Sequence, residues 1–490
     1  MEWSVDRVMR MFAIFVVLFL SPEMDLSAQN PRLELGRRLK RFEHAWETAS
    51  PERRVAAIAP LKEAVGSFFT LRLSEAGRQM DNAWLAVRGE EKPNALTQAM
   101  IGLQLQVSPL CAETEAAPLN LRLKPFYPSA TEIPPQAIAQ LKLTRSTGEL
   151  LAERKCPVLQ LTEGTSWDLE QLPEGDHRLS AVIRHDDATF ALPPITVSRI
   201  DDLHQRLENI KDAAASLKKV TRSAEGPTFD DTLAATLRNE KRVFEDVIEG
   251  LSQEADFPIL YRLTSCESLL ENRSEPRGFG KQLSGSREAW LTLAKGGRAV
   301  PTRVRLPTGN GAPAPVLFVF HGAGGSENMF FETYGAGRVV REAAQRGWIV
   351  VSPRQGLIGL RLDIREMLDA LEELVPLDRE RVMLLGHSMG ASQAVQQVRK
   401  NPGLPIAAIA LGGGGRLSAA DAQRSRRVAW WIGVGDQDFG MASGKQLNRS
   451  LRTSQCPVRM KVYENVEHLV IVQAAIDDAF DFLDQVLARL

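Results

Sequence analysis

Residues 285–490 of this 490-residue chain alternate short apolar runs with amphipathic segments, and this alternation constrains the fold more than any other feature. The apolar runs are PVLFVF, WIVVS, VMLLG, PIAAIAL and VAWWIGV. Strands that are apolar on both faces belong in a sheet that helices cover on both sides. The segments between the runs have helical spacing, so the pattern predicts a doubly wound, mainly parallel α/β sheet.

The run VMLLG leads directly into Gly-His-Ser-Met-Gly, which places Ser388 between a predicted strand and a predicted helix. Gly386 and Gly390 remove side chains where the strand and helix backbones crowd together. The helix N-terminus behind Ser388 favours negative charge that develops at a reacting centre. The motif is short and occurs by chance, so a nucleophilic role for Ser388 also requires a base, an acid and an oxyanion site.

The base is identified by elimination, because this part of the chain contains only His321, His387 and His468. His387 lies inside the turn, and its side chain is predicted to point away along the sheet. His321 precedes glycines after an earlier strand and is predicted to be structural. His468 follows the last predicted strand, at the edge where active sites of open α/β sheets lie. His468 is therefore the predicted general base.

The acid should follow the strand VAWWIGVG, where GDQDFG offers Asp436 and Asp438. A carboxylate at this place would hold the histidine tautomer and stabilise the imidazolium. Asp438 fits a Gly-x-x-Asp loop counted from Gly435 and is the favoured candidate, with Asp436 as the alternative.

An oxyanion site requires backbone N–H groups that point at the developing negative charge. One donor should be the residue after the nucleophile, Met389. The other should come from HGAGGSE, where Ala323 is favoured and Gly324 is next. Alone, this glycine-rich stretch could also cradle a phosphate, but it lacks the Lys-Ser/Thr pair of a P-loop.

Residues 285–490 resemble the α/β-hydrolase superfamily through HGAGG, GHSMGA, GDQDF and EH, which carry Ser, Asp and His in that order. The stretch LVPLDRERVMLLGHSMGA is similar to secreted esterases grouped with polyhydroxyalkanoate depolymerases and feruloyl esterases. The resemblance implies an α/β-hydrolase fold. It also implies ester cleavage through an acyl-enzyme at Ser388, with His468 as base and Asp438 as acid. No metal or organic cofactor is implied.

Two other functions remain open at this stage. A prolyl-oligopeptidase-like serine peptidase shares the triad, although its β domain is usually a propeller and no internal repeat is visible here. A non-catalytic surface or scaffold protein could also retain the fold. For an esterase, the short connection between ALGGGG and VAWWIG predicts an open site without a helical lid, suited to bulky or polymer-attached esters, unless the N-terminal domains cover it. The expected partner is a small-molecule or polymer-linked ester substrate.

The N-terminal half shows no catalytic constellation. Helical spacing is evident over 29–105, and short alternating runs over 106–200 predict a small immunoglobulin-like β-sandwich. A helical hairpin is expected over 201–255, which would close a bundle with the first helices and leave the β segment as an insertion. Residues 256–284 are expected to be a linker before the catalytic domain.

Residues 1–28 are typical of a secretory signal peptide, with Arg7 and Arg10 before MFAIFVVLFL and the small residue Ala28 after it. Export to the periplasm or the exterior is expected, with no stable membrane association after cleavage. An uncleaved membrane anchor is the alternative.

The net charge of −1 does not favour nucleic acid as a partner. The four cysteines are widely spaced without a C-x-x-C, so a metal site is improbable. If disulfides form, Cys111 and Cys156 are the more credible pair, because both fall in the β-rich segment. Oligomeric state is not indicated.

Overall fold

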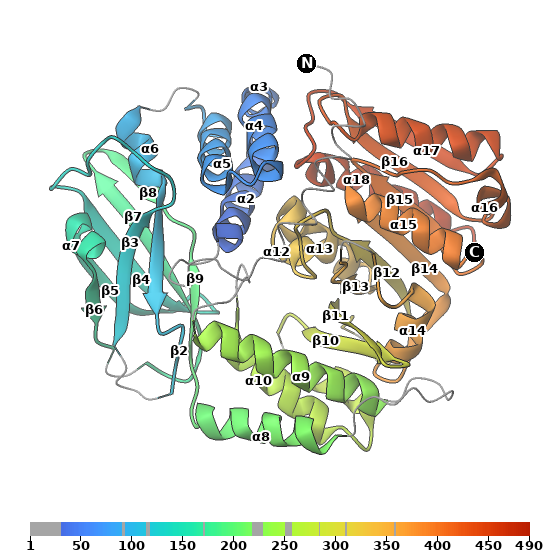
Figure 1. The fold of residues 1–490 in the computed structure, drawn as a ribbon, viewed down its shortest axis with the longest axis horizontal. Coiled ribbons are helices and arrows are strands. Elements are labelled where there is room, and N and C mark those ends of the chain that lie inside the picture. Colours follow the sequence, from blue (N-terminus) through green and yellow to red (C-terminus); the bar gives the residue numbers. More distant parts are fainter. Residues whose placement is uncertain are drawn as a thin grey trace. The chain divides into compact units, whose positions relative to one another are not determined.

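The computed structural model describes residues 31–90, 94–113, 118–169, 172–217, 229–249, 257–283, 285–308, 311–356 and 359–490 (Figure 1). The chain divides into two compact units. The first runs to Asp201 and includes Glu245–Ile259, and the second combines Asp202–Phe244 with Leu260–Leu490. The predicted signal peptide, residues 1–28, lies outside the described residues.

The first unit begins with helices and continues into strands, as the sequence predicts. The helices are α2 (Pro31–Thr48), α3 (Pro51–Ala56), α4 (Ile58–Phe69), α5 (Leu73–Val87) and α6 (Ala95–Ile101). Arg38 of α2 is fully buried, forms an ion pair with Asp81 of α5, and donates to the carbonyl oxygen of Ile101 at 3.1 Å. The Tyr127 hydroxyl also donates to Asp81, at 2.9 Å. This network joins the helices to the strand segment that follows them.

The strands of this unit form two sheets, both largely antiparallel. The strands are β1 (Leu103–Ser108), β2 (Cys111–Ala112), β3 (Leu119–Pro125), β4 (Ile138–Arg145), β5 (Leu150–Pro157), β6 (Thr165–Trp167), β7 (Gly175–His185), β8 (Ala188–Ala191) and β9 (Ile195–Arg199), with helix α7 (Val158–Glu163) after β5. One sheet has the order β1-β3-β6, and the other β2-β9-β7-β4-β5 with β8 beside β7. The immunoglobulin-like arrangement stays a prediction.

The suggested pairing of Cys111 with Cys156 is wrong. Cys111 lies in β2 and Cys156 in β5, and these are the two outer strands in the order β2-β9-β7-β4-β5. Three strands separate them, which corresponds to roughly 19 Å at the usual strand spacing. A disulfide requires Cα atoms within about 7 Å. All four cysteines are buried, free thiols.

The predicted bundle of the first helices with those after the strands stays a prediction. The helices after the strands are α8 (Leu203–Ser216), α9 (Phe229–Ile248) and α10 (Ile259–Glu271), and almost all of their residues belong to the second unit. Helix α9 contacts the C-terminal sheet. The outermost strand of that sheet is β10 (Glu288–Lys295), which leaves one edge without a neighbouring strand. The Thr236 hydroxyl of α9 accepts a hydrogen bond from the Thr292 N–H at 2.8 Å, and Thr232 accepts one from the Ala294 N–H at 3.3 Å. The helix thus satisfies edge groups that no strand pairs.

Residues 256–284, expected to be a linker, contain α10, a short 3₁₀ turn and α11 (Phe279–Gln282). Arg262 of α10 forms a buried two-pronged ion pair with Glu240 of α9, with both distances 2.7 Å. Its guanidinium also lies 4.6 Å from the ring centre of Trp290 in β10. These contacts attach the helices to the sheet.

The C-terminal sheet confirms the predicted α/β architecture. Its remaining strands are β11 (Arg298–Arg305), β12 (Ala314–Phe320), β13 (Ile349–Pro353), β14 (Leu377–His387), β15 (Pro405–Leu411), β16 (Ala429–Gly435) and β17 (Val458–Tyr463). The order is β10-β11-β13-β12-β14-β15-β16-β17, and every pair from β13 to β17 is parallel. Every residue of β12 is buried, as a strand covered on both faces requires.

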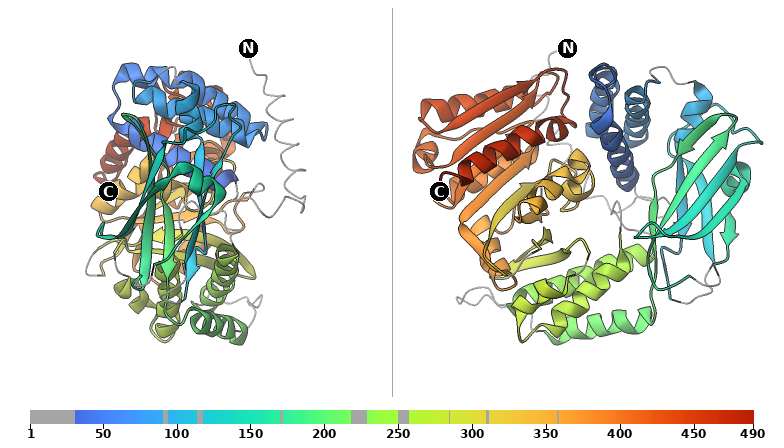
Figure 2. Two further views of the ribbon diagram at one scale, coloured as in Figure 1. Left: turned by 90° about the vertical axis from the view of Figure 1, so that its left-hand side faces the viewer. Right: turned by 180° about the vertical axis from the view of Figure 1, so that it is seen from behind.

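Helices cover both faces of this sheet (Figures 1 and 2). They are α12 (Met329–Glu332), α13 (Arg338–Gln345), α14 (Ile364–Glu372), α15 (Met389–Lys400), α16 (Ala419–Arg424), α17 (Met441–Thr453) and α18 (Ile471–Leu487). Trp348, between α13 and β13, stacks on Phe480 of α18 with ring centres 5.6 Å apart. None of the helices in the described part of the chain is long and apolar enough to cross a membrane.

Candidate active site

Ser388 occupies a sharp turn between β14 and α15. Its backbone angles are φ 58° and ψ −119°, a conformation that L-residues adopt only under constraint. Its N–H donates to the carbonyl oxygen of Leu411 at 2.8 Å, which fixes the turn to the neighbouring strand β15. The turn therefore presents Ser388 at the carboxyl edge of the sheet, as the nucleophile motif predicts.

The two glycines of the motif are required by backbone crowding. A Cβ on Gly386 would lie 2.0 Å from the carbonyl oxygen of Gly390, and a Cβ on Gly390 would lie 1.9 Å from the carbonyl oxygen of Phe320. Both obstructions are backbone atoms, which a side-chain rotation cannot move aside. Strand β14, helix α15 and strand β12 can approach this closely only with glycine at these positions.

His468 and Asp438 form a buried pair on loops that follow β17 and β16. His468 Nδ1 lies 2.7 Å from Asp438 Oδ1, and the two residues are 3% and 5% exposed. Asp438 Oδ1 also accepts the Gly440 N–H at 2.6 Å. Burial alone would lower the pKa of His468, but the Asp438 carboxylate outweighs it and raises that pKa above its ordinary value. The imidazolium form is therefore stabilised by its partner.

Of the two candidate acids, Asp438 is the one that contacts His468. Asp436 is exposed, and its backbone N–H donates to the carbonyl oxygen of Tyr463 at 2.9 Å. Burial alone would raise the pKa of Asp438, but the neighbouring His468 holds it below its usual range.

Gly412 connects this pair to the nucleophile turn. It follows Leu411, the acceptor of the Ser388 N–H, and a Cβ on Gly412 would lie 2.9 Å from Asp438 Oδ2 and 3.2 Å from His468 Nδ1. The end of β15 thus contacts the turn on one side and the acid–histidine pair on the other. Leu411 and Gly412 are thus the link between the Ser388 turn and the Asp438–His468 pair.

His387, beside the nucleophile in sequence, has a positioning role that sequence reasoning did not find. Its Nε2–H donates to the carbonyl oxygen of His468 at 2.9 Å, which ties the loop carrying His468 to strand β14. Complete burial, together with the positive charge of the nearby His468, lowers the pKa of His387 to about 3. It is therefore a neutral hydrogen-bond donor.

His321 is structural, as predicted. Its Nδ1–H donates to the carbonyl oxygen of Gly322 at 2.8 Å, and its Nε2 accepts the Gln355 N–H at 3.1 Å. Burial lowers its pKa to about 4. Both ring nitrogens are occupied in holding the glycine-rich loop after β12.

The glycine-rich loop lies against the nucleophile. A Cβ on Gly322 would lie 3.3 Å from Ser388 Cβ, and the Gly322 N–H already donates to the Tyr334 hydroxyl at 3.3 Å. Ala323 is the next residue whose N–H could serve an oxyanion. Met389 is the first residue of α15, and the first N–H groups of a helix have no partner within it.

Two further residues complete the surroundings. The ring of Tyr334 packs edge-on against His387, with ring centres 4.7 Å apart. Glu467 is buried beside His468 and accepts the Leu469 N–H at 2.7 Å. Burial raises the pKa of Glu467 to about 7. No sequence signal identified Tyr334, whereas Glu467 was visible only as the neighbour of the predicted base.

Residues 316–481 match the model of the "Alpha/beta hydrolase family". Three solved structures are similar. One is a ferulic acid esterase, with 18% identity over 39% of this chain and 93% of that chain and a TM-score of 0.34. Another is the S-formylglutathione hydrolase FrmB of Staphylococcus aureus, with 15% identity over 38% of this chain and 93% of that chain and a TM-score of 0.32. The third is a dienelactone hydrolase-like promiscuous phosphotriesterase from metagenomic libraries, with 15% identity over 41% of this chain and 98% of that chain and a TM-score of 0.34. No curated protein matches this chain.

Proposed function

Starting from an α/β-hydrolase domain, we propose that this chain is a serine hydrolase that cleaves carboxylic esters. The observation that carries the proposal is the buried His468–Asp438 pair, with 2.7 Å between His468 Nδ1 and Asp438 Oδ1. This pair lies beside Gly412, and the preceding residue, Leu411, accepts the hydrogen bond from the Ser388 N–H. A buried acid–histidine pair next to a serine in a strained turn is the arrangement that activates a hydroxyl for acyl transfer.

The proposed reaction has two steps. The Ser388 hydroxyl attacks the ester carbonyl while His468 accepts its proton, and Asp438 stabilises the resulting imidazolium. The N–H groups of Ala323 and Met389 bind the negative charge on the tetrahedral oxygen. His468 then protonates the departing alcohol. Water repeats the sequence on the acyl-enzyme, releases the acid and restores Ser388.

A panel of p-nitrophenyl acyl esters and peptide amides tests the reaction class. Wild type should hydrolyse the esters and react with a fluorophosphonate at Ser388, which peptide mapping would locate. Ser388→Ala should lose both properties. Amide cleavage without ester preference would favour a prolyl-oligopeptidase-like peptidase. If neither the esters nor the amides are hydrolysed and the fluorophosphonate does not label Ser388, a non-catalytic scaffold would be favoured.

The location follows from the predicted signal peptide and is part of the proposal. Expression of the full chain in a bacterial host should give a periplasmic or secreted product that begins after Ala28. N-terminal sequencing of the mature protein checks this. A full-length, membrane-bound product would instead indicate an uncleaved anchor.

A further inference from the structure

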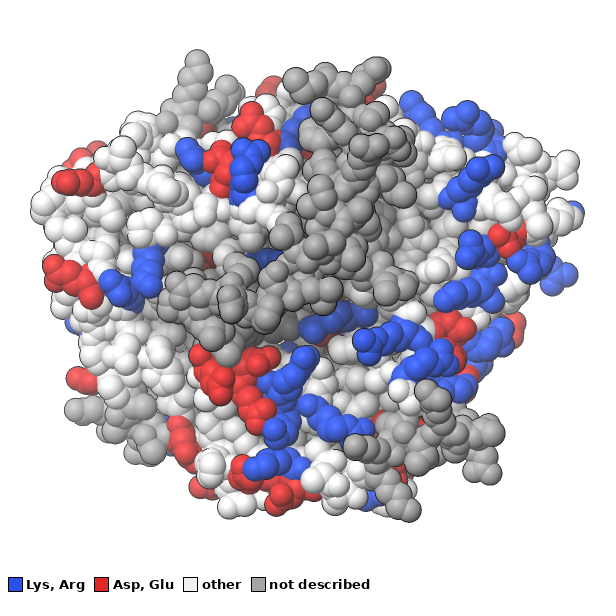
Figure 3. Space-filling model, viewed as in Figure 1, with Lys and Arg blue, Asp and Glu red and all other residues white. Residues whose placement is uncertain are grey.

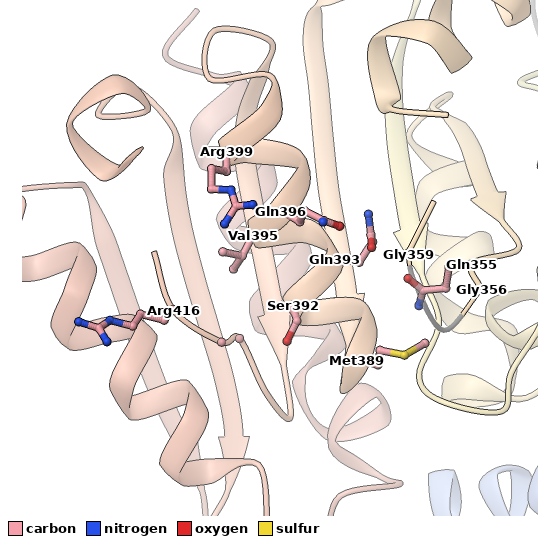
Figure 4. Close-up of a pocket in the computed structure, with 12 residues that line it drawn as sticks. Gln355, Gly356, Gly359, Met389, Ser392, Gln393, Val395, Gln396, Arg399 and Arg416 are labelled. Atoms are coloured by element: carbon pink, nitrogen blue, oxygen red, sulfur yellow. The ribbon is translucent and has the colours of Figure 1, made fainter. Parts of the chain in front are cut away.

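A pocket of about 320 Å³ opens along α15, beginning at the proposed oxyanion donor Met389 (Figure 4). Its walls come from α15, from the loop after β13 and from the loop after β15. Met389, Ser392, Gln396 and Arg399 lie on one side of α15, because residues three and four apart share a helix face. A volume of this size holds part of a small molecule. The pocket thus begins at the residue after Ser388 and extends along the helix.

The pocket contains a buried hydrogen-bond donor without a partner. Gln393 lines it and is 5% exposed, yet its Nε2 has no hydrogen-bond partner among the described residues. Its side chain extends from α15 toward the loop of Gly359 (Figure 4), and a Cβ on Gly359 would lie 3.1 Å from Gln393 Oε1. An unsatisfied buried donor costs about 1–3 kcal/mol, so a ligand that accepts from it gains binding energy.

Arg399 adds a positive charge to the same pocket. Its guanidinium turns back along α15 over Val395 and Gln396 (Figure 4). In the described part of the chain, no carboxylate forms an ion pair with it. Asp421 is near enough for its charge to interact with Arg399, but its carboxylate already accepts from the Ser418 hydroxyl at 2.6 Å and pairs with Arg424.

The surrounding surface is also basic. Residues 389–457 carry nine Lys and Arg residues against three Asp residues, although the whole chain is almost neutral. Figure 3 shows Lys and Arg side chains predominating on the side of this view where α15, α16 and α17 lie in Figure 1. Such a field attracts anionic ligands and speeds their association. Arg416 stands on the opposite wall of the pocket, with its guanidinium directed away from α15 (Figure 4).

We propose that this pocket binds an anionic group, specifically a carboxylate, on the part of the ester substrate that does not react. The inference rests on the proposed esterase function and names the substrate class for that site. Arg399 would pair with the carboxylate, and the Ser392 hydroxyl on the same side of α15 would donate to it, while the Gln393 amide would donate to another acceptor of the same ligand. A carboxylate accepts from a guanidinium and from a hydroxyl, whereas a neutral alkyl chain would leave these donors unsatisfied.

The helix geometry sets the length of such a substrate. Arg399 is ten residues after Met389, which is about 15 Å along the helix axis. Helical side chains lean toward the N-terminus, so the guanidinium reaches back by roughly 5–6 Å. The carboxylate should therefore lie on the order of 9 Å from the ester carbonyl, a span of about seven bonds.

Two matched ester pairs test the proposal and distinguish the side that carries the charge. On the acyl side, the p-nitrophenyl monoester of suberic acid is compared with the mixed diester in which the free carboxylate is a methyl ester and the p-nitrophenyl ester is kept. On the alcohol side, 4-acetoxycinnamate is compared with its methyl ester. Wild type should show a kcat/KM about tenfold or more higher for the carboxylate member of at least one pair. The preference should shrink as NaCl is raised.

Three variants localise the preference. Arg399→Gln should reduce the carboxylate-to-neutral ratio to about one, and the nearly isosteric Gln393→Glu should invert it, because its carboxylate repels the ligand. The matched control is Lys400→Gln, which removes a charge from an exposed neighbour outside the pocket and should keep the ratio within about twofold.

The outcomes separate this proposal from the proposed function. Hydrolysis of the neutral members without any carboxylate preference would overturn the anion pocket and leave the esterase proposal standing. The pocket is also ruled out if Lys400→Gln lowers the ratio as much as Arg399→Gln. Hydrolysis of none of the four esters would overturn the proposed function itself, and the substrate class with it.

Discussion

Replacing Asp438 with Asn removes one charge at the centre of the proposed triad without changing the shape of the side chain. Asp438 Oδ1 accepts from His468 Nδ1 at 2.7 Å and from the Gly440 N–H at 2.6 Å. An amide that keeps its oxygen there holds the histidine tautomer but loses the charge. An amide that turns its NH₂ group toward Nδ1 leaves the proton on Nε2, which then cannot accept a proton from Ser388.

The expected loss follows from burial. Both partners are at least nine-tenths buried, and removing one partner of a buried ion pair costs about 3–5 kcal/mol. The pair is fully charged only when His468 has taken the serine proton, so this cost falls mainly on the transition state. At 1.36 kcal/mol for each factor of ten, Asp438→Asn should lower kcat by about 10²- to 10⁴-fold.

The pH profile should change in a defined direction. His468 acts as a base in its neutral form, and its pKa is raised, so wild-type activity should increase through a midpoint above the ordinary histidine value of about 6.5. In Asp438→Asn the carboxylate no longer raises this pKa, while burial still lowers it. The acidic limb should therefore move to lower pH, although the plateau is lower.

The assay is kcat/KM for a neutral p-nitrophenyl ester between pH 5 and 9, with Asp436→Asn as the control. Asp436 is exposed and does not contact His468, so its variant should stay within about twofold of wild type. If Asp438→Asn keeps more than a tenth of the activity, or if its acidic limb moves to higher pH, the assignment of the acid is incorrect.

Three other changes separate chemistry, packing and titration. Ser388→Ala should abolish ester turnover and leave thermal stability within about 1 kcal/mol, since Ala accepts the strained turn as well as Ser; residual turnover above about one per cent would contradict the nucleophile. Gly390→Ala should lower the free energy of urea unfolding of the C-terminal domain by more than about 3 kcal/mol, because its Cβ would lie 1.9 Å from the Phe320 carbonyl oxygen. The control Gly403→Ala, which has open space around it, should change this free energy little. Glu467→Gln should flatten the pH dependence of stability. Burial raises the pKa of Glu467 to about 7, whereas in the unfolded chain it is near 4.5. The protonated side chain therefore stabilises the fold fully below pH 4.5, and up to about 3 kcal/mol of this stabilisation is lost as the pH rises through 7. Equal changes in melting temperature between pH 5 and 8 in wild type and variant would refute this.

The sequence predicted the C-terminal fold because each strand and helix carries its own periodic signal. Runs such as PVLFVF needed no partner to be recognised as buried strands. Ser388 directly follows β14, while Asp438 and His468 lie on the loops after β16 and β17, and parallel strand ends meet at one edge, so all three could be proposed from the strand pattern. Spacing in the sequence favoured Asp438 over Asp436, but only the contact with His468 distinguishes the two carboxylates.

What the sequence could not predict depends on contacts between distant segments. The helical pattern of α9 was recognisable, but its partner depended on the unpaired edge of β10, which becomes evident only with the strand order. The Cys111–Cys156 suggestion failed for the same reason, because membership of one β segment does not fix which strands are neighbours.

The positions missed at the site share a physical cause. His387 acts through a backbone carbonyl 81 residues away, and Gly412 is required by the space that Asp438 and His468 occupy. Neither role has a local signature, because each is defined by an atom of another loop. The reacting groups can therefore be changed without unfolding the domain, whereas the glycines that allow the loops to meet cannot. Loss of activity with retained stability in Ser388→Ala, and loss of both in Gly390→Ala, is the pattern that this separation requires.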